Sequence, residues 1–108
     1  MIYELRIYTC PPGRLPDLMR RFEDHTLKLW ERHGIEQAGF WTTLIGNSNN
    51  DLTYMLRWPS LAAREDRWAA FLADPEWQEA RKASEANGPI VANVASQLLT
   101  PTGFSSQR

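Results

Sequence analysis

The chain has 108 residues, of which 43% are hydrophobic and 23% charged, and its net charge is −1. This length suits one domain and leaves no room for separate cofactor and substrate domains. The near-neutral balance of 12 basic and 13 acidic residues argues against nucleic acid or an anionic membrane as the main partner, because either favours a basic surface. The chain has twelve aromatic side chains, from five Trp, three Tyr and four Phe, which is a large number for its length.

Cysteine and histidine are scarce. Cys10 is the only cysteine, so no internal disulfide and no cysteine-based zinc site are expected. Two histidines nearly exclude a pure histidine metal site, and no metal is predicted. Glu4 and Arg6 interrupt any apolar signal-peptide core at the start. No apolar run is long enough to span a bilayer. We therefore expect a cytoplasmic location.

The first half of the chain predicts a strand, a helix and a hairpin. Residues 2–9 alternate and are rich in β-branched and aromatic side chains, which is typical of a strand. A Pro-Pro-Gly turn ends it. Residues 16–33 follow as a helix, with Gly34 expected as its left-handed cap. Residues 35–46 and 52–58 read as two strands joined by a polar turn, an antiparallel hairpin.

The second half predicts two short helices and a last strand. Pro59 stops the hairpin, and Ser60 is placed to cap a helix. Asp74 and Pro75 form an N-cap and N1 pair that begins the next helix. Residues 90–100 read as the last strand. We assign residues 1–102 to one domain and residues 103–108 to a polar tail.

The element order β-α-β-β-α(α)-β predicts an α+β, ferredoxin-like fold, a four-stranded antiparallel sheet with helices on one face. The first strand is then central, beside the third and the last. We expect Tyr3, Leu5 and Ile7 to point toward the helices and the opposite face to carry Ile2, Glu4, Arg6 and Tyr8. The third strand adds either Thr53, Met55 and Arg57 or Tyr54, Leu56 and Trp58 to that opposite face.

The uncovered face of the predicted sheet needs a partner. Rings are expected on both faces, while the helices cover only one. A monomer seldom exposes a patch with several large apolar groups. The simplest remedy is a second copy packed face to face with two-fold symmetry, so a homodimer is predicted.

Four segments in order resemble the NIPSNAP family: YELRIYTCPPG, HGIEQAGFWTTLIG, RWPSLAAREDRWAAFLADPEWQEAR and LLTPTGFS. The resemblance runs from residue 2 to about residue 105. It implies the dimeric α+β barrel superfamily, in which two ferredoxin-like subunits join sheet to sheet. Other members of that superfamily include cofactor-free monooxygenases acting on aromatic polyketides, haem-degrading enzymes and small isomerases. The resemblance carries over no catalytic residue.

His33 and Tyr8 are the candidate catalytic residues. His33 at a helix end could transfer protons in a cleft, or it could simply interact with the helix dipole. His25, at the edge of the apolar stripe, is better explained as a structural histidine. Cys10 is better explained as an inert residue at a strand end.

The candidate ligand-binding residues are Glu4, Arg6, Trp41, Tyr54 and Arg57. Glu4, Arg6 and Tyr8 share one strand face, and Arg57 lies on the neighbouring strand. Together they either orient a ligand inside an apolar cavity or form a cross-strand ion pair that fixes dimer register. The aromatic residues either line a pocket for a flat ligand or are plain core.

Three functions remain open from the sequence. The first is an enzyme, monooxygenase-like or isomerase-like, that acts on a small aromatic or apolar molecule without a cofactor. The second is a non-catalytic dimer that binds such a ligand or another protein. The third is a scaffold whose loops recruit partners. The sequence contains no phosphate-binding, dinucleotide-binding, nucleophile-elbow or zinc-protease motif.

Overall fold

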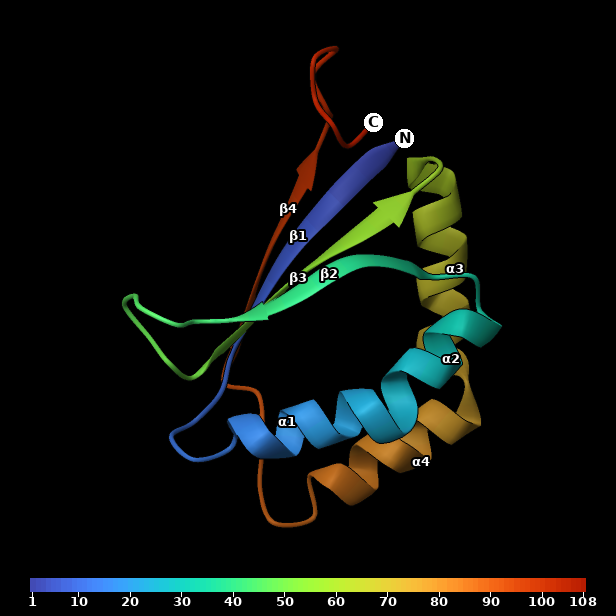
Figure 1. The fold of residues 1–108 in the computed structure, drawn as a ribbon. Helices are drawn as coiled ribbons and strands as arrows, with labels where there is room; N and C mark the ends of the chain where they lie inside the picture. The colour runs from blue at the N-terminus through green and yellow to red at the C-terminus, as the bar shows by residue number, and fades with distance from the viewer.

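The sheet has the predicted ferredoxin-like order. In the computed structural model, which describes all 108 residues, four antiparallel strands lie in the order β2-β3-β1-β4. Their bounds are β1 (Ile2–Thr9), β2 (Glu36–Thr42), β3 (Asp51–Trp58) and β4 (Asn93–Leu99). The first strand is central, between the third and the last (Figure 1). The α+β fold class is thus confirmed.

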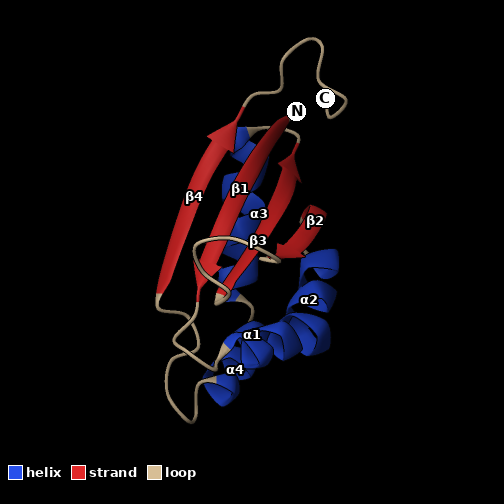
Figure 2. Ribbon diagram, turned by 60° about the vertical axis from the view of Figure 1, so that its left-hand side comes forward, coloured by secondary structure: helices blue, strands red, loops and turns tan.

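The helices lie on one face of the sheet. They are α1 (Leu15–Arg21), the π-helical turn η1 (Phe22–Thr26), α2 (Leu27–Arg32), α3 (Leu61–Ala73) and α4 (Pro75–Ser84). Figure 2 looks onto the sheet, with α3 behind its central strands. All seven residues of β4 are exposed, so the helical layer does not close over this edge.

The predicted helix boundaries rest on local capping, and the structure confirms them. The Ser60 hydroxyl accepts a hydrogen bond from the Ala63 amide at the start of α3, and Asp74 accepts one from the Glu76 amide at the start of α4. Gly34 has φ +70°, as expected for the residue that ends α2.

Three elements differ from the predictions. The helix predicted over residues 16–33 contains the widened turn η1, in which the Leu27 amide donates to the Phe22 carbonyl. The Thr26 hydroxyl donates to the Arg21 carbonyl just before this turn, at 3.2 Å. The second strand is shorter than residues 35–46, and its register shifts between Gln37 and Phe40. The last strand begins at residue 93 rather than 90.

The prediction that Tyr3, Leu5 and Ile7 face the helices is wrong. Glu4 pairs with Arg64 of α3, so Glu4, and with it Arg6 and Tyr8, points into the helical layer. A polar row can be buried there because its groups find hydrogen-bond partners on other elements. On β3, the side chains buried under the helices are Leu52, Tyr54, Leu56 and Trp58.

Most of the aromatic rings gather on the helix side of the sheet. Nine of the twelve belong to this core or pack against it: Tyr8, Phe22, Trp30, Phe40, Tyr54, Trp58, Trp68, Phe71 and Trp77. Neighbouring rings make tilted, edge-to-face and stacked contacts, such as Phe40 on Tyr54 with centroids 4.9 Å apart. The aromatic surplus is therefore mainly a property of the single subunit.

The opposite face of the sheet, here called the open face, has no covering layer. Because directly opposed residues of antiparallel strands share a face, the strand register assigns this face these residues: Tyr3, Leu5, Ile7, Glu36, Trp41, Thr53, Met55, Arg57, Ala95, Gln97 and Leu99. Trp41 is 53% exposed.

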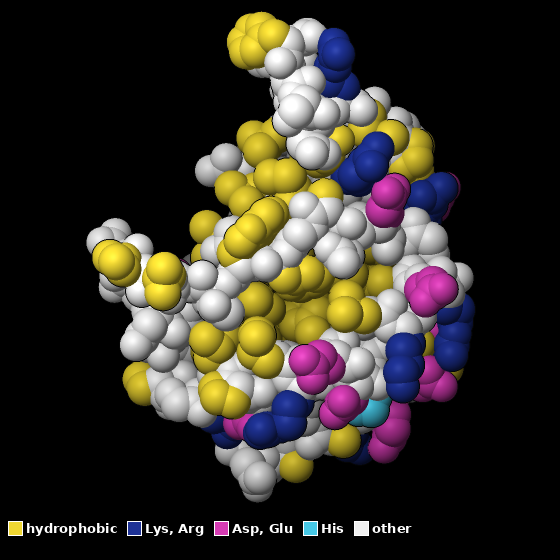
Figure 3. Space-filling model, in the orientation of Figure 1, with side chains coloured by type: hydrophobic (Ala, Val, Ile, Leu, Met, Phe, Trp, Pro, Cys, Tyr) yellow, Lys and Arg dark blue, Asp and Glu magenta, His cyan; other side chains and the backbone are white.

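Two segments project from the body of the subunit. They are the β2–β3 connection and the chain after β4 (Figure 1). Leu44 and Ile45 in the first and Phe104 in the second are each more than 90% exposed. Hydrophobic side chains lie at the ends of both projections (Figure 3). No helix is long and apolar enough to cross a membrane.

Candidate functional site

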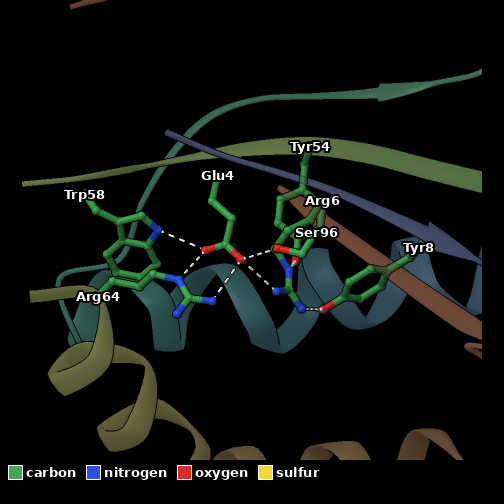
Figure 4. Close-up of polar contacts among 7 residues, drawn as sticks. All are labelled: Glu4, Arg6, Tyr8, Tyr54, Trp58, Arg64 and Ser96. Atoms are coloured by element: carbon green, nitrogen blue, oxygen red, sulfur yellow. Dashed lines mark hydrogen bonds and ion pairs between the residues drawn. The ribbon is translucent and has the colours of Figure 1, made fainter. Parts of the chain in front are cut away.

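A buried polar cluster, here called the Glu4 network, lies between the sheet and α3. Its members come from three strands and one helix (Figure 4): Glu4, Arg6, Tyr8, Tyr54, Trp58, Arg64 and Ser96. It spans the helix-side face of β1 at the centre of the sheet.

Glu4 is the centre of this network, with only 1% of its surface exposed. One carboxylate oxygen accepts hydrogen bonds from the Trp58 indole at 3.1 Å and Arg64 Nε at 2.8 Å. The other accepts from Ser96 Oγ at 2.7 Å, Arg6 Nη1 at 3.0 Å and Arg64 Nη2 at 3.2 Å. Burial alone would raise the pKa of Glu4, but these hydrogen bonds outweigh it and lower the pKa to about 2. Glu4 is therefore ionised at neutral pH.

Arg6 connects Glu4 to two phenols. Its Nε donates to the Tyr54 hydroxyl at 2.7 Å, and its Nη2 donates to the Tyr8 hydroxyl at 3.2 Å. Its guanidinium carbon also lies 4.9 Å from the centre of the Trp68 ring, a cation–π contact. Burial raises the pKa of Tyr54 well above its usual value, so Tyr54 stays a neutral phenol.

A cavity opens beside this network, between β1 and β4 on one side and α3 and α4 on the other. We call it the helix-side cavity, and its volume is about 450 Å³. Its walls are formed by Arg6, Tyr8, Arg21, Trp68, Phe71, Leu72, Trp77, Arg81, Glu85, Val91, Ala92, Asn93 and Val94. Eight of the thirteen lining residues are hydrophobic, and the others bring several charged groups to the walls. A space of this size with placed polar groups has the dimensions of a small-molecule site.

A second hollow lies at the other edge of the sheet, between β2 and the α1–α2 helical segment. It is smaller, about 300 Å³, and six of its eight lining residues are hydrophobic, Trp41 and Phe40 among them. Figure 3 shows hydrophobic side chains lining the hollow at the centre of that view. It lacks the buried polar groups of the helix-side cavity.

The structure brings together four of the predicted site residues. Glu4, Arg6, Tyr8 and Tyr54 form one hydrogen-bonded chain, and Arg6 and Tyr8 reach the helix-side cavity. It does not bring Arg57 to them.

Arg57 and Trp41 both belong to the open face. Arg57 packs on the Tyr3 ring and lies 3.4 Å from a Glu36 oxygen. Trp41 lies over Gly39 of its own strand, whose φ of +122° and close ring contact suit glycine alone. The expected grouping of Arg57 with Glu4, Arg6 and Tyr8 is therefore corrected: neighbouring strands share a face only at opposed positions, and Arg57 opposes Tyr3.

Neither histidine lines the helix-side cavity. His33 Nε2 lies 2.7 Å from Asp74 Oδ2, and Asp74 also pairs with Arg32. The hydrogen bond from His33 is the main reason why the pKa of Asp74 is lowered. His33 thus joins the end of α2 to the start of α4, and its catalytic role stays a prediction. His25 is exposed. No group of three or more His, Cys, Asp or Glu side chains is arranged to hold a metal ion.

Sequence reasoning missed Arg21 and Arg64. Neither is among the candidate site residues that the sequence predicts. Arg21 is instead 6% exposed and lines the cavity, and Arg64 makes two hydrogen bonds to Glu4. The spacing of Arg64 seven residues before Phe71 places it on the core side of α3, which is a signal the sequence does contain.

The chain belongs to the NIPSNAP family. The family model matches residues 3–106, nearly the whole chain. This agrees with the resemblance of the four segments. No curated protein matches the chain.

Solved structures of the same family have the same fold. An uncharacterized NIPSNAP-like domain protein from Burkholderia xenovorans is 28% identical, with a TM-score of 0.85 over 96% of this chain and 87% of that one. A NIPSNAP family protein from Agrobacterium tumefaciens is 22% identical, with a TM-score of 0.88 over 99% and 98%. A candidate antibiotic biosynthesis monooxygenase from Chloroflexus aurantiacus is more distant, at 15% identity and a TM-score of 0.60 over 97% of each chain. This last likeness concerns the fold alone.

Proposed function

We propose that the protein is a homodimer in which each subunit binds a small, flat, largely apolar ligand in the helix-side cavity. The observation that carries this proposal is the position of Arg6 and Tyr8. Both are held by part-buried hydrogen bonds, and both line a cavity of about 450 Å³ whose other walls include Trp68, Phe71 and Trp77. Fixed polar groups among aromatic walls orient a ligand without reorganising when it binds.

The open face supports the dimer. Leu5, Ile7 and Met55 lie on it without any covering element of their own chain. The exposed side chains of Leu44, Ile45 and Phe104 extend from the same subunit. Pairing two open faces about a two-fold axis would remove this apolar surface from water.

The ligand is tested by calorimetric titration with 2-naphthol, a neutral aromatic probe. We expect the wild-type protein to bind it. Val94→Phe should lose binding, because Val94 lines the cavity mouth and is 42% exposed, so a larger ring can enter without disturbing the core. Ala62→Phe, at an exposed position of α3, is the matched control and should bind normally. Unchanged affinity in Val94→Phe would overturn the proposed site.

Catalysis is a second candidate function, favoured by one observation. The Tyr8 hydroxyl lines the cavity and accepts a hydrogen bond from Arg6, which leaves its own proton available to a bound ligand. Chromatography of 2-naphthol recovered after incubation in air separates the alternatives. An oxidised or rearranged product would support a monooxygenase-like or isomerase-like enzyme, and intact probe would support a binding protein.

A further inference from the structure

The walls of the helix-side cavity carry more positive than negative charge. Three arginines line it, the buried Arg21, the part-buried Arg6 and the exposed Arg81, against one carboxylate, Glu85. The remaining nearby anion, Glu4, already serves Arg64 as well as Arg6. Buried charge of one sign costs free energy unless a counter-charge is present. The walls of the cavity therefore carry an excess of positive charge that an anionic ligand would neutralise.

Arg21 shows this excess most clearly. It is 6% exposed, and its buried Nε has no hydrogen-bond partner. Its Nη1 donates to Ser84 Oγ at 3.2 Å and forms an ion pair with a Glu85 oxygen at 3.7 Å, which is too long for a hydrogen bond. Burial lowers the pKa of Arg21, yet an arginine remains protonated in proteins. The group is a buried cation whose hydrogen-bonding capacity is only partly used.

Arg6 has spare capacity of the same kind. A guanidinium has five N–H donors, and Arg6 directs one each to Glu4, Tyr54 and Tyr8. Two N–H groups on its terminal nitrogens remain for another acceptor. A carboxylate matches the planar fork of a guanidinium and accepts two hydrogen bonds at once.

Aromatic rings flank these cations. Trp68 stacks on Arg6, and Trp77 lies 5.3 Å from the guanidinium carbon of Arg21. Phe71 contacts both Trp68 and Trp77. All three rings line the cavity. Such walls favour a flat, unsaturated body attached to the anionic group.

We propose that the ligand of the helix-side cavity is a planar aromatic carboxylate, whose carboxylate pairs with Arg21 at the charged wall and whose ring packs on Trp68 and Phe71. This inference rests on the proposed function and narrows its ligand class. A monoanion with an apolar body suits both the partly satisfied guanidinium of Arg21 and the aromatic walls, whereas inorganic phosphate suits only the guanidinium.

The test compares 2-naphthoate with 2-naphthamide, a neutral ligand of nearly the same shape, by calorimetric titration. We expect the wild-type protein to bind the acid about tenfold more tightly than the amide, the size expected of a charge-assisted hydrogen bond. Arg21→Gln should remove this preference, so that the acid and the amide bind with equal affinity. Arg20→Gln is the matched control, because the neighbouring Arg20 is exposed and pairs with Asp17 at the helix surface. Inorganic phosphate should compete weakly or not at all.

The outcomes separate the two levels of the proposal. Equal binding of acid and amide by the wild-type protein, or a preference that survives in Arg21→Gln, overturns the carboxylate inference and leaves the cavity as a ligand site. No binding of either compound overturns both. If Arg21→Gln fails to fold, thermal unfolding of the wild-type protein decides, since the acid should raise its Tm more than the amide does.

Discussion

Glu4 shows why a charged residue can occupy the centre of this sheet. Its two oxygens accept five hydrogen bonds, two of them from a single guanidinium in a bidentate pair. These hydrogen bonds offset the large free-energy cost of removing the carboxylate from water. The stability of its ionised form therefore depends on all of these partners. The same hydrogen bonds fix Arg6, and through Arg6 the Tyr8 hydroxyl at the cavity wall. Glu4 thus holds Arg6, and through it Tyr8, in place.

The Glu4 network makes stability depend on pH in a defined window. The pKa of Glu4 is about 2 in the folded chain, against 4.5 as the ordinary value. The folded state therefore binds the proton less readily than the unfolded state. The stabilisation is complete above pH 4.5 and is lost as the pH falls toward about 2.

Glu4→Gln should lower the free energy of unfolding at pH 7 by about 3 kcal/mol, because it leaves two arginines without their buried counter-charge. It should also flatten the pH dependence below pH 4.5. Glu36→Gln, at the exposed pair with Arg57, is the control and should change little. Urea unfolding at several pH values measures both effects. A Glu4→Gln protein that keeps the wild-type pH profile would contradict this account of the network.

At the scale of elements, local signals predicted the helix ends and the strand order well. Ser60, Asp74 with Pro75, and Gly34 act through neighbours one to four residues away, so their roles are readable from the sequence. The widened turn η1 has no comparable signal, because a π turn has no strong sequence pattern. It inserts a residue into the helix just after Arg21. The cavity role of Arg21 was therefore not predictable.

The choice of face on β1 was also beyond the sequence. Alternation shows which residues share a face but not which face the helices cover. Leu5 and Ile7 are apolar, which favours placing their face under the helices, although the structure places it on the open side. What decides the choice is the set of partners for Glu4. Trp58, Arg64 and Ser96 lie 54, 60 and 92 residues away along the chain. Only the folded structure brings them together.

Ser60→Ala should lower the free energy of unfolding by about 1 kcal/mol, because the Ala63 amide loses its capping acceptor. Ser60→Asn is the matched control: it restores a capping oxygen and should recover most of the loss. Chemical denaturation measures the difference. Equal stability of the Ala and Asn variants would show that the cap contributes nothing to α3.

At the scale of the whole molecule, the two faces of the sheet differ in what covers them. The helix side holds nine of the twelve rings, the Glu4 network and the cavity. The aromatic surplus therefore belongs chiefly to the subunit core. The proposed dimer would instead use the open face, where Trp41 is 53% exposed, together with the exposed Leu44, Ile45 and Phe104.

Light scattering after size-exclusion chromatography should give twice the 12.5 kDa chain mass at micromolar concentration. Met55→Glu should shift the mass to that of one chain, because Met55 lies opposite Leu5 on the open face and a buried unpaired charge disfavours the interface. Ala62→Glu on the exposed surface of α3 should remain dimeric. A wild-type mass of 12.5 kDa would refute the dimer.

The central claim, that the helix-side cavity is the ligand site, is tested most directly by the indole N–H signals of the five tryptophans during an NMR titration with 2-naphthol. Trp68 and Trp77 line the cavity, while Trp41 lies on the open face beside the second hollow. We predict that the signals of Trp68 and Trp77 shift with added ligand and that the signal of Trp41 stays in place. Shifts confined to Trp41 would place the ligand elsewhere and contradict the account.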